Sequence, residues 1–195
     1  MDERTLELYN ELVKIITPDT VFACVGAVRT TSYLDSVGPQ VGDILQANGI
    51  PYVYGTHKNP YNGLTAEKMA KTIKKHHKNN TVIAIDTCCC HSLKKLYKIQ
   101  LEKGHIAPGA GVGKELTRVG DYSIKAYLIS WKDTDLIPNN ELLNSKKCGF
   151  LINKTDEMVK IISDAIIQAY KDACSKPLID IIEIENNKTN VSKLI

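Results

Sequence analysis

The sequence lacks several features that would assign the chain to a class directly. No stretch approaches the roughly 18 consecutive apolar residues that a membrane-spanning helix needs. The N-terminal segment MDERTLELYNELVKII has no apolar core of the kind found in signal peptides. The net charge is only +3, which is too small and too dispersed to indicate a nucleic-acid-binding surface. We therefore expect a protein that binds neither membranes nor nucleic acids.

The six cysteines lack the spacing of a disulfide framework or of a zinc site. Three of them are adjacent, at positions 88–90, and no C-x-x-C pair is present. Adjacent thiols would be vulnerable in an oxidising compartment, so we expect a cytoplasmic protein. His91 follows the three cysteines directly. A metal site or a Cys–His nucleophile is therefore an alternative to plain buried thiols.

Apolar runs and amphipathic periodicity alternate along the chain. Continuous apolar runs predict buried strands at 21–27 and 81–90, and shorter patterns predict further strands at 51–56, 96–102 and 123–131. Helical periodicity predicts helices at 2–16, 37–48, 66–78 and 155–174, the last two opened by Thr65 and Thr155 as N-caps. This order indicates an α/β protein, a three-layer α/β/α sandwich with a twisted, mostly parallel sheet.

The length of 195 residues suits one domain with a tail. We place a single peptidase-like α/β domain at residues 1–176 and a C-terminal tail at 177–195. The tail begins with the apolar stretch 178–184, which makes a homodimer an expectation because exposed apolar surface is often covered by a partner.

Two aspartates follow the two most apolar strands. Asp35 lies in the polar loop after the first strand, and Asp86 ends the apolar part of the run at 81–90. Ligands of open α/β sheets bind beyond the carboxyl ends of the strands, so neighbouring strands would bring these acids together. Two close carboxyls have pKa values that are pushed apart, which lets one act as a base and the other as an acid in amide hydrolysis. The alternative is that each only caps a helix or a turn.

A glycine-rich loop, HIAPGAGVGKEL, lies at 105–116. It fails the Walker pattern, because positions 108 and 115 hold Pro and Glu, and it does not match the dinucleotide fingerprint. We expect its backbone amides to hold an anion or an extended peptide, unless the loop is a plain surface turn.

Four segments together carry a family resemblance: CVGAVRTTSYLDSVGPQVG, VYGT, VIAIDTC and APGAGVGKELTRVGDYSI. Over residues 21–131 the chain resembles the YyaC-type sporulation proteins, which are described as spore proteases. That family is similar to germination protease, which degrades small acid-soluble spore proteins, and to the hydrogenase maturation endopeptidases. The resemblance implies an α/β/α sandwich and a sporulation-linked endopeptidase of aspartic type. It also implies a protein or peptide substrate, spore proteins among them, in the cytoplasm of the spore or sporulating cell.

The resemblance also implies roles for individual residues. Asp35, before SVGP, and Asp86, in IDTC, match the proposed catalytic pair of germination protease. In the hydrogenase maturation enzymes the matching acids help to bind nickel with a later His, for which His91 and His105 are the candidates here. Apart from that alternative no cofactor is expected. The residues expected to bind substrate are Arg29, Thr30, Thr31, Gly109, Gly111 and Gly113.

The chain departs from the family pattern in the loop after the first strand. The pattern G-T-D-R-S-T-G-D-S-L-G-P reads GAVRTTSYLDSVGP here, so Val28 replaces the first aspartate and the loop is two residues longer. The Cys-Leu-Gly that usually follows the second aspartate is replaced by three cysteines. Two alternatives therefore accompany the peptidase prediction: a catalytically inactive binding or assembly protein on the same fold, and a metal-dependent maturation peptidase.

Overall fold

A computed structural model describes residues 1–28, 33–109, 113, 115–130 and 146–175. Its five-stranded sheet has the order β2-β1-β3-β5-β4. All neighbouring strands are parallel except β4 and β5, which are antiparallel. The strands are β1 (Val21–Cys24), β2 (Val53–Tyr54), β3 (Val82–Cys90), β4 (Ile99–Lys103) and β5 (Tyr122–Ser130).

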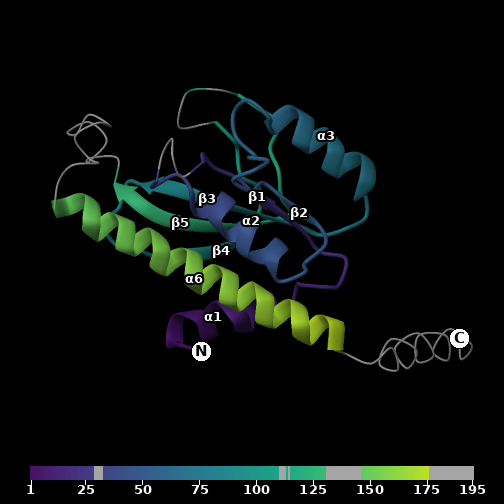
Figure 1. Ribbon diagram of the computed structural model, residues 1–195, viewed down its shortest axis with the longest axis horizontal. Helices are drawn as coiled ribbons and strands as arrows, with labels where there is room; N and C mark the ends of the chain where they lie inside the picture. Colours follow the sequence, from purple (N-terminus) through teal and green to yellow (C-terminus); the bar gives the residue numbers. More distant parts are fainter. Residues whose placement is uncertain (29–32, 110–112, 114, 131–145, 176–195) are drawn as a thin grey trace, which may run out of the picture.

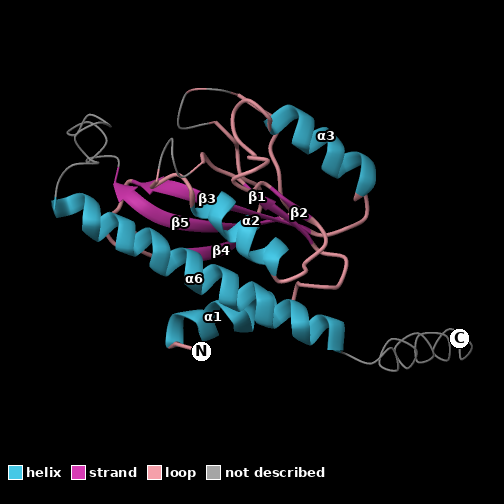
Figure 2. Ribbon diagram, viewed as in Figure 1, coloured by secondary structure: helices cyan, strands magenta, loops and turns pink. Residues whose placement is uncertain are grey.

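Helices cover both faces of this sheet. Figure 2 shows α1 (Glu3–Leu12), α2 (Val37–Ala47) and α6 (Lys146–Ser175) on one face and α3 (Ala66–His76) on the other. The predicted three-layer α/β/α sandwich with a mostly parallel sheet is therefore confirmed (Figure 1). In the described part of the chain, no helix combines the length and the apolarity needed to cross a bilayer.

The larger core lies between the sheet and α1, α2 and α6. Met158, Ile162 and Ile166 recur at helical spacing on α6 and are fully buried against residues such as Phe22 and Ile124. Each fully buried Ile of this kind contributes roughly 1.5–3 kcal/mol. A smaller cluster on the other face joins β1 and β3 to α3. The sheet is thus buried on both faces at its centre, which explains the continuous apolar runs of β1 and β3.

Helix α2 rests directly on the backbone beneath it. A Cβ atom at Gly38 would overlap the carbonyl oxygen of Val25, and one at Gly42 would overlap that of Gly55. Only glycine allows an approach this close. The contact fixes the first turn of α2, immediately after Asp35, over the carboxyl end of β1.

Some predicted boundaries were wrong. Helix α6 begins at Lys146 rather than at Thr155. The Thr155 hydroxyl donates to the Leu151 carbonyl (2.8 Å), the i−4 bond that a threonine makes in the middle of a helix. Thr65 does precede α3, but its hydroxyl donates to the Pro60 carbonyl (2.6 Å) and does not cap the helix. The tail at 177–195, with the apolar stretch expected to form a dimer, lies outside the described residues.

Candidate functional site

The order of the strands creates a switch point between β1 and β3. The chain passes from β1 through α2 to β2 on one side, then through α3 back across β1 to β3 on the other. Ligands of open α/β sheets bind at such points, beyond the carboxyl ends of the strands. β1 ends first: the Val25 N–H donates to the Ile85 carbonyl (2.7 Å), while β3 continues beside β5 as far as Cys90.

Asp35 lies at this switch point, two residues before α2. The Ala27 N–H donates both to the Asp35 carbonyl (2.9 Å) and to its carboxylate Oδ2 (3.1 Å). Burial raises the pKa of Asp35 to about 6, and the bond from Ala27 partly opposes that rise. The carboxyl group is thus tethered and partly desolvated, and it changes its charge near neutral pH.

Asp86 lies in β3, one residue beyond Ile85, which is the last β3 residue in register with β1. Burial raises the pKa of Asp86 well above its usual range, and the charge of Asp35 raises it further, while the Thr87 N–H opposes the rise. The two carboxyls are therefore electrostatically coupled. Both carboxyls therefore bind their protons more tightly than ordinary aspartates do, and burial is the main cause in each case. The structure brings together the two acids that the sequence singled out.

Cys88 and Cys89 lie beside the acid pair. Burial raises the pKa of Cys88 to about 12, and the charge of Asp86 contributes. Burial likewise raises the pKa of Cys89, followed by the charge of Asp35. Thiols react as thiolates, so both are poor nucleophiles at neutral pH, which disfavours the Cys–His alternative.

The neighbouring cation of the sheet is engaged elsewhere. Lys125 is the register partner of Asp86 on β5, but its ammonium group donates to Glu102 on β4 (2.6 Å). Because Lys125 is paired with Glu102, no cation in the described part of the chain lowers the pKa of Asp86, and burial and the charge of Asp35 keep that pKa raised.

The two histidines proposed as metal ligands lie in different settings. His91 is exposed and comes directly after β3. His105 Nε2 accepts a hydrogen bond from Arg118 Nη1 (2.7 Å), which occupies that ring nitrogen. Among the residues that the structure describes, no three His, Cys, Asp or Glu side chains are grouped so as to hold a metal ion. A metal set of Asp35, Asp86 and His91 stays a prediction.

The predicted substrate-binding residues are only partly described. Arg29, Thr30, Thr31 and Gly111 lie outside the described residues. Gly109 and Gly113 adopt φ values of +76° and +69°, which favour glycine, so both sit in tight turns. The loop ends on α3, because Thr117 donates to Glu67 through its N–H (2.6 Å) and its hydroxyl (2.8 Å). Peptide binding by these glycines stays a prediction.

Sequence reasoning missed one polar pair near the end of β2. Asp43 Oδ2 on α2 lies 2.5 Å from His57 Nδ1, and the His57 N–H donates to Asp43 Oδ1 (3.2 Å). The other ring nitrogen, His57 Nε2, is buried and has no hydrogen-bond partner among the residues that the structure describes. The two residues come from different elements, which meet because Gly42 and Gly55 let α2 approach β2 closely. No spacing rule in the sequence signals such a contact.

Comparison with known proteins places the chain in a family. Residues 2–164 match the model of a family described as a protein of unknown function, DUF1256. The chain is 37% identical over 119 residues to the uncharacterized protein YyaC of Bacillus subtilis (strain 168). That alignment covers 60% of this chain and 57% of the relative, so the chain spans little more than half of the length of this relative. The resemblance to YyaC is confirmed, whereas the relation to germination protease and to hydrogenase maturation endopeptidases stays a prediction. The chain belongs to the DUF1256 family.

Proposed function

We propose that this protein is an endopeptidase of aspartic type, in which Asp35 and Asp86 act as the catalytic pair. The observation that carries the proposal is the coupling of two partly desolvated carboxyls at the switch point of the sheet. Carboxyl pairs whose environments separate their pKa values are suited to combined acid and base work.

We assign the roles from the causes of the two pKa shifts: burial and the charge of Asp35 both raise the pKa of Asp86, so Asp86 is the group assigned to hold a proton. Asp35, ionised above pH 6, takes a proton from a water molecule as that water attacks the carbonyl carbon of the scissile amide. Asp86, still protonated, donates its proton to the departing amine as the C–N bond breaks. The proton held by Asp35 then passes to Asp86, directly or through water, which restores the starting state.

An extended peptide is the favoured substrate because β3 extends beyond the end of β1 and leaves an edge to which a peptide can bind. Beyond Ile85, no backbone hydrogen bond joins β3 to the chain of β1 in the described part of the molecule. Backbone groups alternate sides along a strand, so those of Thr87 point to the same side as the Ile85 carbonyl, before the register with β5 shifts between Cys88 and Cys89. A peptide that pairs with this edge would carry its amide past Asp86. On the motif resemblance to YyaC-type sporulation proteins, we further propose a protein substrate in the cytoplasm of the spore-forming cell.

The test compares cleavage by the wild type and by three single variants. The full chain is incubated at pH 7 with a peptide library prepared from a bacterial proteome, and new termini are identified by mass spectrometry. We expect Asp35→Asn and Asp86→Asn to lose at least 100-fold in cleavage rate, in line with the usual contribution of one acid–base group. Asp19→Asn removes the same charge at an exposed turn and should cleave like the wild type.

A specific observation favours one alternative. Val28 stands where the family pattern has an aspartate, as expected if the chain kept the fold as a binding or assembly protein. Peptides retained but not cleaved by the wild type would support that alternative. Cleavage that persists in both aspartate variants would contradict the acid pair.

A further inference from the structure

Strand β4 is an edge of the sheet with an orderly set of outward backbone groups. The Tyr127 N–H donates to the Lys98 carbonyl (3.0 Å), and the Gly104 N–H donates to the Asp121 carbonyl (2.8 Å). In an antiparallel pair the inward-bonding residues alternate, so Gln100 and the other even-numbered residues bond to β5. The backbone groups of Ile99 and Leu101 therefore face outward. Within the described ranges, no strand pairs with that side.

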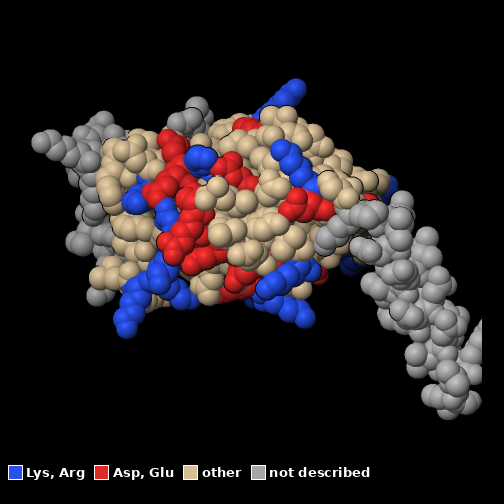
Figure 3. All heavy atoms as spheres, turned by 90° about the horizontal axis from the view of Figure 1, so that it is seen from below, with Lys and Arg blue, Asp and Glu red and all other residues tan. Residues whose placement is uncertain are grey.

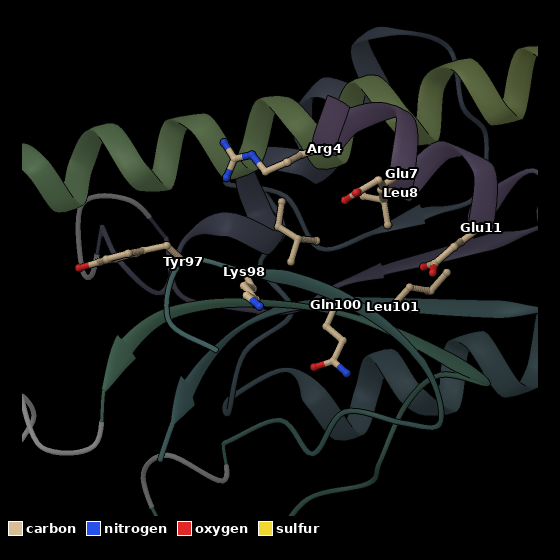
Figure 4. A pocket seen from close by; sticks show the side chains of 9 residues that line it. Arg4, Glu7, Leu8, Glu11, Tyr97, Lys98, Gln100 and Leu101 are labelled. Carbon is tan, nitrogen blue, oxygen red and sulfur yellow. The ribbon is translucent and has the colours of Figure 1, made fainter. Parts of the chain in front are cut away.

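Among the residues that the structure describes, none covers the flank of this edge. A groove of about 440 Å³ runs between α1 and β4, and Leu8, Ile99 and Leu101 contribute its apolar lining. Figure 4 shows α1 on one side of the groove, and the Gln100 side chain pointing away from that helix. Edge strands are usually protected by proline, a bulge or a covering element, and β4 contains neither proline nor a bulge.

The charges around the groove have both signs. Its α1 wall carries Arg4, Glu7 and Glu11, and β4 contributes Lys98. Figure 3 shows acidic and basic side chains close together on the face seen from below. A surface of mixed sign does not select a strongly acidic or basic partner. It can, however, match a rotated copy of itself.

The sequence of β4 is complementary to itself in one antiparallel register. When Gln100 faces Gln100 of a second copy, the outward groups of Ile99 meet those of Leu101 of that copy, and vice versa. The same register places Lys98 opposite Glu102 of the second copy, twice over by symmetry. Opposite charges and apolar pairs facing each other stabilise antiparallel strands. A slip by two residues in either direction removes the Lys98–Glu102 match.

We propose that the chain forms a twofold-symmetric homodimer in which β4 pairs with β4 of a second copy, with Gln100 at the axis. The two sheets then form one continuous sheet, and the Ile99 and Leu101 side chains of each copy line the groove beside α1. Glu102 can serve both partners, because Lys125 engages its Oε2 and leaves the other carboxylate oxygen for Lys98 of the second copy. The acid pair lies near β1 and β3, away from this edge, so both sites stay open.

The test uses a pair of opposite charges at the symmetry axis. Sedimentation velocity at low ionic strength should show that the full-length wild type is a dimer. Gln100→Lys and Gln100→Glu each place like charges opposite one another, so we expect the dimer dissociation constant to rise at least tenfold for each alone. An equimolar mixture should form a heterodimer, because the two new charges then attract. Gln100→Met, similar in size and uncharged, should dimerise like the wild type.

Circular dichroism of each variant verifies that the monomer is folded, so that a change in assembly is not a loss of structure. A wild type that stays monomeric at 100 µM would overturn the proposal. So would charge variants that dimerise like the wild type, or a mixture that does not recover the dimer.

Discussion

Replacing Asp35 with Asn should stabilise the protein at neutral pH while removing its proposed catalytic base. The folded state raises the pKa of Asp35 from 3.8 to about 6, so the folded chain binds this proton more tightly than the unfolded chain. The stabilising contribution is then fully present below about pH 4 and is lost as the pH rises through 6. At pH 7 the ionised carboxylate lowers the free energy of unfolding.

The magnitude follows from the size of the shift. A rise of about two pKa units corresponds to about 3 kcal/mol, because one unit is about 1.4 kcal/mol. Asp35 is half-buried, so screening by solvent reduces the expected effect to about 1.5–3 kcal/mol. The Asn side-chain oxygen can still accept the Ala27 N–H.

The assay is urea unfolding followed by far-ultraviolet circular dichroism at pH 4, 5, 6 and 7. The difference in unfolding free energy between Asp35→Asn and the wild type should grow by about 1.5–3 kcal/mol from pH 4 to pH 7. Asp19→Asn, at an exposed position, should show a difference that hardly changes over this range. If the Asp35→Asn difference were also constant with pH, the desolvation of Asp35 and its role as a tuned base would both be refuted.

Three further predictions concern packing and thiol chemistry. Gly42→Ala should lower the unfolding free energy by more than about 2 kcal/mol, because its methyl group would overlap the Gly55 carbonyl. Gly149→Ala on α6 is the control, because its methyl group meets open space and should not destabilise the protein. Urea titration measures both variants. Ile162→Ala should cost about 2–5 kcal/mol, because Ile162 is fully buried in the larger core, and the same titration measures it. Cys88 should react with a disulfide reagent at pH 7 at least tenfold more slowly than the exposed Cys174. Mass spectrometry of the labelled peptides measures the two rates. Equal rates would contradict the raised pKa of Cys88.

The apolar runs of the sequence predicted the centre of the sheet well. β1 and β3 are covered on both faces, so almost every side chain in their paired segments is apolar and the pattern is unambiguous. Asp35 and Asp86 could be singled out from the sequence because both follow apolar strands, and ligands of open α/β sheets bind beyond the carboxyl ends of the strands. The pKa shifts of the two acids could not be predicted from the sequence, because desolvation depends on which residues pack around each carboxyl group.

Other features depended on contacts between distant segments. The start of α6 was misplaced because Thr155 is a capping residue by type, and only its bond to Leu151 shows that it lies within the helix. The pair of Asp43 and His57 needs the close approach of α2 to β2. The short pattern at 96–102 predicted the strand that became β4, but which of its backbone groups face outward depends on its register with β5.

The two hydrogen bonds that the Ala27 N–H donates to Asp35 have a consequence for the loop between these residues. The seven residues between them form a segment whose two ends are closed by the Ala27 N–H. Insertions or substitutions inside that segment can therefore change what surrounds the acid without changing where the acid is. This would allow the loop to be two residues longer than the family pattern while Asp35 keeps its place. A loop from a relative, grafted between these two residues, should change the surroundings of Asp35 while the carboxyl group stays in place, which makes the segment a natural module for engineering.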